Sequence, residues 1–243
     1  GIGGLGEVLS IAGLAGTTLY EPGALTMVAK AGTPVAEIEA ALAQENQRLA
    51  FEPMDHCGVL GSTGVPTIGG VFAGNFSGPR RISVGAARDF LLGVRYVDGR
   101  GTVVKNGGRV MKNVTGYDLV KLMSGAHGTL GVLSEVSLKT LPKVEMQLCL
   151  RVTNLDAQKA VSAMSAALGS PFEISGAAHD IDGSVLLRLE GFEASVRYRS
   201  ERLKAILSSF GDIDILDDQK TCEGLWRDIR DARRFTGSTG NLW

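Results

Sequence analysis

Three short runs of sequence place glycine beside polar side chains, and all of them fall between residues 66 and 131 or just beyond. They cover residues 66–70, 111–119 and 125–132. Glycine has no Cβ atom, so it accepts positive φ and lets the main chain come very close to another group. Runs of this kind favour contact between backbone and a large flat or phosphorylated ligand.

The first run has the composition of an anion-binding turn. Successive N–H groups of Ile68, Gly69 and Gly70 would form a concave nest that suits a diphosphate. The side chains of Thr67 and Asn75 would add hydrogen bonds. The alternative is an ordinary glycine-rich turn that connects a loop to a helix, and these residues alone leave both interpretations open.

Two common nucleotide motifs are missing from the sequence. No Gly-x-x-x-x-Gly-Lys-Ser/Thr segment occurs, which excludes a Walker loop. No Gly-x-Gly-x-x-Gly segment lies between a predicted strand and a predicted helix, which excludes the Rossmann fingerprint. A dinucleotide site in this chain would therefore belong to another fold.

The composition is that of a globular protein with one unusual feature. Glycine accounts for 33 of 243 residues, about twice the average usage of roughly 7%. A net charge of −1 gives no electrostatic reason to expect nucleic acid as a partner. No apolar run approaches the roughly 20 residues of a bilayer span, so we expect no transmembrane segment. The three cysteines lack Cys-x-x-Cys spacing, which predicts a reducing compartment and no metal site.

Hydrophobic patterning predicts the elements that hold these runs. In the first part of the chain we expect a strand at 25–31, a helix capped by Thr33 that ends before Phe51, a long irregular stretch at 52–87, a hairpin at 91–105, a short helix at 118–123 and a strand at 132–140.

After Pro142 the pattern changes, because glycine thins and regular elements follow one another closely. We expect strands at 146–153, 172–178, 184–191 and 213–216, with helices after Asp156 and at 193–209. The order β-α-β-β-α-β is that of the ferredoxin-like split βαβ arrangement. The predicted fold class is therefore α+β, with domains at 1–142 and 143–243.

The three runs, taken together and in this order, resemble the vanillyl-alcohol-oxidase (PCMH-type) family of FAD-binding flavoproteins. The resemblance implies a PCMH-type domain of two α+β subdomains over 1–142, the first of them truncated because the family's upstream phosphate loop is missing. It implies a ferredoxin-like cap domain, also truncated, over 143–243. FAD would bind non-covalently between the first domain and the base of the cap.

The family's motifs also imply which residues contact the cofactor. The implied cofactor-binding residues are Pro66, Thr67, Ile68, Gly69, Gly70, Asn75, Gly78, Arg81, Thr115, Gly116, Tyr117, Asp118, Gly128, Thr129, Gly131 and Val132.

Within the family, residues 31–34, 77–81, 107–118 and 174–176 are most similar to the E subunits of bacterial glycolate oxidases. This resemblance implies an FAD-binding subunit that helps to oxidise glycolate or another small 2-hydroxy acid to a 2-oxo acid. Its implied partners are a second flavoprotein subunit and an iron–sulfur subunit, in the cytoplasm or peripherally on the inner membrane through these partners. The alternatives are an assembly subunit without FAD and a self-sufficient D-lactate or D-2-hydroxyacid dehydrogenase.

Several further residues allow two interpretations. His127 could tune a flavin or occupy a variable linker position. Arg80 and Arg81 could bind a phosphate or carboxylate, or could order their own loop. Asp118 is expected to cap the next helix rather than to act as a base, and residues 227–234 are expected to form a solvated helix face. The sequence assigns no catalytic residue.

Overall fold

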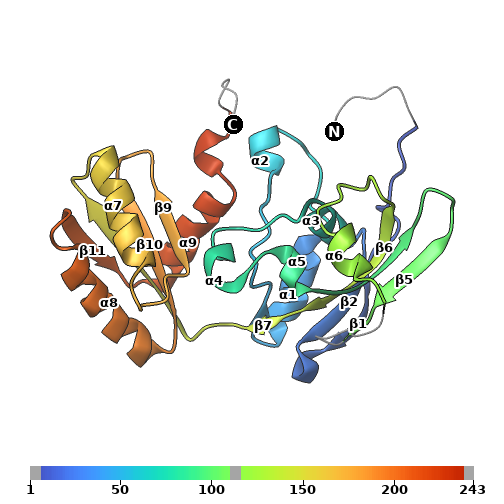
Figure 1. Ribbon diagram of the computed structural model, residues 1–243, viewed down its shortest axis with the longest axis horizontal. Helices are drawn as coiled ribbons and strands as arrows, with labels where there is room; N and C mark the ends of the chain where they lie inside the picture. Colours follow the sequence, from blue (N-terminus) through green and yellow to red (C-terminus); the bar gives the residue numbers. More distant parts are fainter. Residues whose placement is uncertain (1–6, 110–115, 238–243) are drawn as a thin grey trace. The chain divides into compact units, whose positions relative to one another are not determined.

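The computed structural model describes residues 7–109 and 116–237 of the chain, shown in Figure 1. These residues form two compact units. The first contains the described parts of Gly1–Arg48, Val65–Asn75 and Ala87–Leu141, and the second contains those of Leu49–Gly64, Phe76–Ala86 and Pro142–Trp243. The segments 49–64 and 76–86, which the sequence assigns to the first domain, thus belong to the second compact unit.

The first unit is built on a five-stranded antiparallel sheet in the order β1-β2-β6-β4-β5. Its strands are β1 (Thr17–Glu21), β2 (Thr26–Lys30), β4 (Leu91–Val97), β5 (Val103–Gly107) and β6 (Val132–Lys139). Its helices are η1 (Pro22–Ala24), α1 (Val35–Gln44), α3 (Ile68–Gly74), α5 (Ala87–Phe90) and α6 (Leu119–Met123). The short strands β3 (Gln47–Arg48) and β7 (Leu141–Pro142) pair separately.

Helices α3 and α6 pack against this sheet. Helix α3 contacts β2 and β6, whereas α6 contacts β4 and β5. The apolar side chains of Met27, Phe72 and Val136 are buried in the core. The described parts of the glycine runs lie at the ends of these helices, so the sheet and its core fix the positions of these parts.

The second unit has the predicted ferredoxin-like topology. Its sheet is antiparallel in the order β11-β8-β10-β9. Its elements are α2 (Cys57–Leu60), α4 (Arg81–Val84), β8 (Met146–Thr153), α7 (Ala157–Leu168), β9 (Gly176–His179), β10 (Val185–Gly191), α8 (Glu193–Leu207), β11 (Asp212–Leu216), α9 (Gln219–Arg230) and η2 (Arg233–Phe235).

Alternation along the strands gives this sheet two different faces. Leu148, Leu150 and Leu187 point into the main core with α7 and α8. Cys149 and Leu186 point to the opposite face, where they pack with Trp226 and Cys222 of α9. Figure 1 shows α7 and α8 on one side of the sheet and α9 on the other. Arg188 lies on this second face, and its guanidinium stacks over the Trp226 ring at 4.5 Å.

The α+β class and the split βαβ order are confirmed, and several local expectations are wrong. Thr33 does not cap α1, because its hydroxyl bonds the main chain of Gly16 and Lys30 and Pro34 occupies the N-cap position. The stretch at 52–87 contains short helices instead of being irregular throughout. Strand β1 is a further addition, and β9 is shorter than expected.

Candidate functional site

The first glycine run is docked beside the turn that connects β2 to α1. The Val35 amide donates to the Pro66 carbonyl at 2.9 Å, and the Ile68 amide donates to the Thr33 carbonyl at 2.9 Å. Gly69 lies so close to Ala31 that a Cβ atom on it would be 2.6 Å from the Ala31 Cβ. Close packing within the protein therefore requires glycine at position 69.

These internal contacts contradict the prediction that the first run forms a nest for a diphosphate. The Ile68 and Gly69 amides donate hydrogen bonds to the Thr33 and Ala31 carbonyls, respectively. The Gly70 amide donates to the Thr67 hydroxyl at 3.3 Å. Thr67 therefore acts as the N-cap of α3. The expectation that these three amides point at a ligand is wrong, although the residues themselves stay predicted cofactor contacts.

The third run contacts the C-terminal end of α3, the helix that begins within the first run. The Phe72 carbonyl accepts from the Gly125 amide at 3.0 Å and from the Ser124 hydroxyl at 3.2 Å. The Ala73 carbonyl accepts from the His127 amide at 2.8 Å. The last carbonyls of a helix have no partner within the helix, so the third run satisfies them. His127 takes a left-handed φ of 51° to do so.

Asn75 connects the end of α3 to helix α6, which follows the second run. It ends α3 with a left-handed φ of 52°, and its side-chain oxygen accepts from the Arg88 amide at 2.9 Å. The Arg88 carbonyl in turn accepts from the ammonium of Lys121 in α6. Burial lowers the pKa of Lys121, against the opposite effect of Asp89 and Asp118. Asn75 thus serves as a structural link between α3 and α6.

The second run begins outside the described residues, where Thr115 lies. Asp118 caps α6 by accepting from the Lys121 amide at 3.1 Å, as expected. Asn106 fixes this turn from β5, since its side chain donates to the Tyr117 carbonyl and accepts from the Val120 amide. The Tyr117 side chain is 88% exposed, which leaves it open to a ligand or partner.

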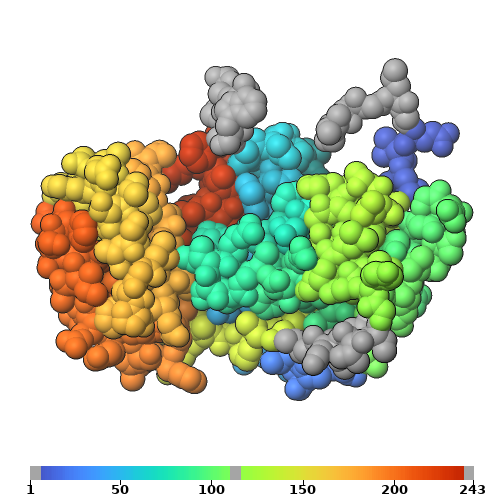
Figure 2. All heavy atoms as spheres, in the orientation of Figure 1, coloured from blue at the N-terminus to red at the C-terminus, as the bar shows by residue number. Residues whose placement is uncertain are grey.

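Two glycines in the second and third runs have open space above them. Gly116 and Gly128 have φ of 77° and 75°, and an added Cβ would have no described protein atom within 4 Å. Both residues are exposed, as are Thr129 and Leu130 beside Gly128. Figure 2 shows α6 and the third run, in yellow-green, on the surface. These residues fit a ligand that lies against exposed backbone, as the implied FAD would.

The remaining residues of the third run are held by the sheet. Thr129 bonds back to Ala126 through both its amide and its hydroxyl. A Cβ on Gly131 would be 2.7 Å from the Val97 carbonyl oxygen, so packing excludes a side chain there. Val132 starts β6 opposite Val97. The run therefore leads directly from exposed backbone into the sheet.

Gly78 and Arg81 are part of the second unit. A Cβ on Gly78 would be 2.5 Å from the Glu52 carbonyl oxygen, so internal packing explains this glycine without a cofactor. Arg81 starts the short helix α4, and its side chain is exposed. Both stay predicted cofactor contacts.

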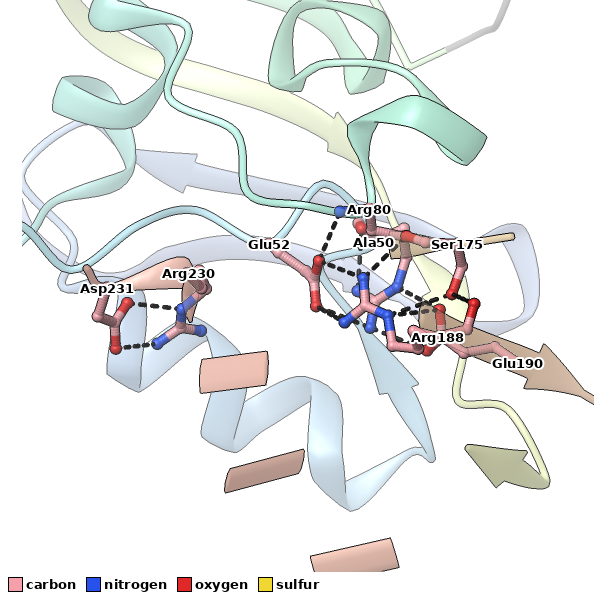
Figure 3. Close-up of polar contacts among 8 residues, drawn as sticks. All are labelled: Ala50, Glu52, Arg80, Ser175, Arg188, Glu190, Arg230 and Asp231. Carbon is pink, nitrogen blue, oxygen red and sulfur yellow. Dashed lines mark hydrogen bonds and ion pairs between the residues drawn. The ribbon is translucent and has the colours of Figure 1, made fainter. Parts of the chain in front are cut away.

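The neighbouring Arg80 has a structural role within the second unit. Its guanidinium bonds Glu190 at 2.8 and 2.9 Å and Glu52 at 2.9 Å. Arg188 bonds the same Glu52 carboxylate at 2.7 and 2.8 Å, as Figure 3 shows. We call Glu52, Arg80, Arg188 and Glu190 the charge network. Burial lowers the pKa of Arg80, and Glu190 opposes that change.

The sequence analysis did not predict the charge network. The sequence allows Arg80 either to bind a ligand or to order its own loop, and the contacts of its guanidinium favour the second role. One signal was present: Arg188 is the single charged residue amid the apolar positions 185–189 of a predicted strand. A charge there must find a buried partner, although the sequence does not show which one.

The described ranges 7–109 and 116–237 contain neither a metal-binding cluster nor a membrane-spanning helix. No cluster of at least three His, Cys, Asp or Glu side chains could hold a metal ion there. None of the described helices has both the length and the apolar character needed to cross a bilayer.

Comparisons with known proteins agree with the resemblance. Residues 4–107 match the model of the FAD binding domain family. The chain is 37% identical over 239 residues to glycolate oxidase subunit GlcE of Escherichia coli, covering 98% of the chain and 62% of that protein. It is 40% identical over 81 residues to glycolate oxidase subunit GlcD of Bacillus subtilis, covering 33% of the chain and 17% of that protein.

A solved structure supports the fold. The chain superposes on alkyldihydroxyacetonephosphate synthase with a TM-score of 0.68 at 18% identity, over 91% of the chain and 45% of the synthase. At this identity the match concerns the fold alone. The chain spans less than two thirds of the length of each of these proteins.

Proposed function

We propose that this chain, whose residues 4–107 match the FAD binding domain family, is the PCMH-type flavin-binding subunit of an oxidoreductase that converts a small 2-hydroxy acid into a 2-oxo acid. The observation that carries the proposal is the similarity to a glycolate oxidase subunit, which extends over 98% of the chain. Glycolate is the proposed substrate, and D-lactate is the second choice.

The first unit supplies the proposed FAD contacts. The exposed backbone at Gly116 and Gly128 would lie against the cofactor, and the side chains of Tyr117 and Thr129 would border it. Asn75 and Lys121 would act on the site indirectly, because their hydrogen bonds link α3 to α6. Bound FAD would supply the two-electron acceptor that amino-acid side chains lack, while the protein binds and orients it. We propose non-covalent binding.

The partners are part of the proposal. A glycolate oxidase subunit of the GlcD type is the proposed second flavoprotein, and an iron–sulfur subunit would receive the electrons. The complex would work in the cytoplasm or on the inner face of the membrane through these partners.

One observation favours a second candidate, an assembly subunit that lacks FAD. The amides of Ile68 and Gly69, which we expected to bind the diphosphate, donate to main-chain carbonyls of the protein instead. The visible absorption spectrum of the purified full-length protein distinguishes the two candidates. A flavin band supports the first, and its absence after reconstitution with FAD supports the second.

A pair of matched variants tests the site itself. Gly128→Asn places a side chain over the exposed backbone, and asparagine tolerates the left-handed conformation. We expect the affinity for FAD to fall about tenfold or more, which is roughly 1.4 kcal/mol. Gly61→Asn is the control, because Gly61 has φ of 60° and open space but lies outside the runs. Equal FAD affinity of the two variants would refute the assignment.

A further inference from the structure

The second unit contains a small pocket that the proposed FAD contacts do not use. It has a volume of about 110 Å³ and lies between the end of β9 and the end of α9 with η2. Its apolar walls come from Ala178, Ile229 and Phe235, and its polar groups include His179 and Arg234. Helix α9 and η2, in red in Figure 2, form this part of the surface.

A strained backbone places the arginine in the pocket. Ala232 has a left-handed φ of 49°, an uncommon conformation for a residue with a Cβ atom. It turns the chain after α9 so that η2 can follow, and the Phe235 amide donates to the Ala232 carbonyl at 3.0 Å. Such strain persists only where the surrounding structure maintains it, and it is concentrated at functional sites.

Asp180 orients Arg234 without using all of its donors. One Nη2 atom of Arg234 lies 2.7 Å from Asp180 Oδ2, while Asp180 Oδ1 accepts from the Ile181 amide at 2.7 Å. The Asp180 side chain is only 7% exposed. A guanidinium has five N–H donors in a fork. Within residues 7–109 and 116–237, the Arg234 side chain has no other hydrogen bond or ion pair, and it is 40% exposed.

Other arginines of the second unit differ from Arg234. Arg188 has bonds from all three guanidinium nitrogens, to Ser175 and Glu52. Arg199 likewise bonds three carbonyl oxygens, those of Ser195, Phe172 and Glu190. These two arginines are saturated by the protein, whereas Arg234 is oriented by one carboxylate and keeps donors for a second one.

The size and charge of the pocket define the ligand. One water occupies about 30 Å³ of the liquid and a cavity of about 150 Å³ binds benzene, so this pocket suits roughly four to six heavy atoms. The guanidinium matches a carboxylate in a bidentate manner. Asp180 pairs with Arg234 and Asp228 pairs with Arg233, so the pocket carries no excess positive charge, which favours a monoanion over a phosphate dianion. The His179 imidazole would bond a hydroxyl or keto oxygen next to the carboxylate.

We propose that this pocket binds a small monocarboxylate, with Arg234 as the carboxylate contact and Asp180 as the residue that orients it. The carboxylate class follows from the geometry of the pocket. The narrower assignment to a 2-hydroxy or 2-oxo acid rests on the proposed function. Binding here would give the second unit a ligand site of its own.

Isothermal titration of the full-length protein with glycolate and with its neutral amide, glycolamide, tests this. We expect glycolate to bind and glycolamide to bind at least about tenfold more weakly, because charged hydrogen bonds distinguish them. Arg234→Gln should weaken glycolate binding by a similar factor. Arg197→Gln is the matched control, since Arg197 pairs with Glu193 on the surface and neither residue lines the pocket. It should change the affinity less than about twofold.

The variant Asp180→Asn should not weaken glycolate binding as Arg234→Gln does. Asparagine keeps a side-chain oxygen that can orient Arg234 but lacks the competing negative charge, so we expect glycolate to bind as well as before or more tightly. Equal binding of glycolate and glycolamide, equal loss in the two arginine variants, or no binding of glycolate would each overturn the proposal. If Arg234→Gln does not fold, chemical shifts of Ala178 and Phe235 during glycolate titration of the unmodified protein decide the question, and unchanged shifts overturn it.

The flavin band recorded on the same samples separates this proposal from the proposed function. Flavin retained without glycolate binding overturns the pocket and the choice of glycolate as substrate, but not the proposed flavin binding. Glycolate binding without any flavin supports the pocket and overturns the proposed flavin function.

Discussion

The three glycine runs of the first unit and the charge network of the second unit both join segments that are distant in sequence, but they do so by opposite means. The third run bonds through its main chain to the end of α3, the helix that begins within the first run, and Gly116 and Gly128 stay exposed. The charge network joins side chains that are almost fully buried and whose charges are satisfied by one another. Where main-chain hydrogen bonds hold the segments together, backbone stays exposed for a ligand to contact. In the charge network, by contrast, the charged side chains satisfy one another and none is left for a ligand.

The largest expected effect comes from breaking the charge network. Arg188→Met leaves Glu52 and Glu190 to share Arg80, so an uncompensated buried charge remains. We expect the free energy of unfolding to fall by about 3–5 kcal/mol. Urea denaturation measures it, with Arg197→Met as control because Arg197 forms an exposed pair with Glu193. Similar losses in the two variants would mean that the network adds no more than a surface pair.

A smaller effect is expected at Gly69. An alanine there brings its Cβ to 2.6 Å from the Ala31 Cβ and 2.7 Å from the Ala31 carbonyl oxygen. Overpacking of this kind costs about 1–3 kcal/mol of stability. Gly128→Asn should leave the urea denaturation of the FAD-free protein unchanged and affect FAD binding alone. If Gly69→Ala reduced FAD binding without loss of stability, the first run would be a ligand contact rather than a packing contact.

The smallest effect is expected from the two thiols behind the second sheet, and only at alkaline pH. Burial raises the pKa of Cys149 to about 12 and that of Cys222 to about 11, from an ordinary value of 9.0. The unfolded chain therefore loses these protons first, so stability should fall as the pH rises from about 9 through the folded values. Denaturation at a series of pH values measures the slope.

The double variant Cys149→Ala with Cys222→Ala serves as the comparison for that slope. It should show a shallower decline of stability above about pH 9, because the groups that titrate differently in the folded and unfolded chain are gone. An unchanged decline would assign the alkaline destabilisation to other groups.

The sequence predicts the second unit better than the first. Strands β8 and β10 and helices α7 and α8 have clear local periodicity, and their order alone specifies the ferredoxin-like arrangement. Strand β1 has no such signal, because it lies in a stretch rich in glycine and alanine. Hydrophobic periodicity is a local signal that extends over a few residues. It therefore predicts the regular elements of the second unit but not β1.

The site was predictable as a set of residues but not as a set of contacts. The Asp118 cap could be expected because its partner lies three residues away. The carbonyls of Ala31 and Thr33, which accept from the first run, belong to a distant segment that no local pattern identifies. The same is true of the charge network, whose pairs are separated by 110 and 136 residues.

The discontinuous second unit has a consequence for gene recombination. Pro142 marks an obvious crossover point for chimaeras between this chain and a homologue, because the composition changes there. A crossover at that point would take Glu52 and Arg80 from one parent and Arg188 and Glu190 from the other. Chimaeras that inherit residues 49–64 and 76–86 together with the region after residue 142 keep the four charges as one inherited set.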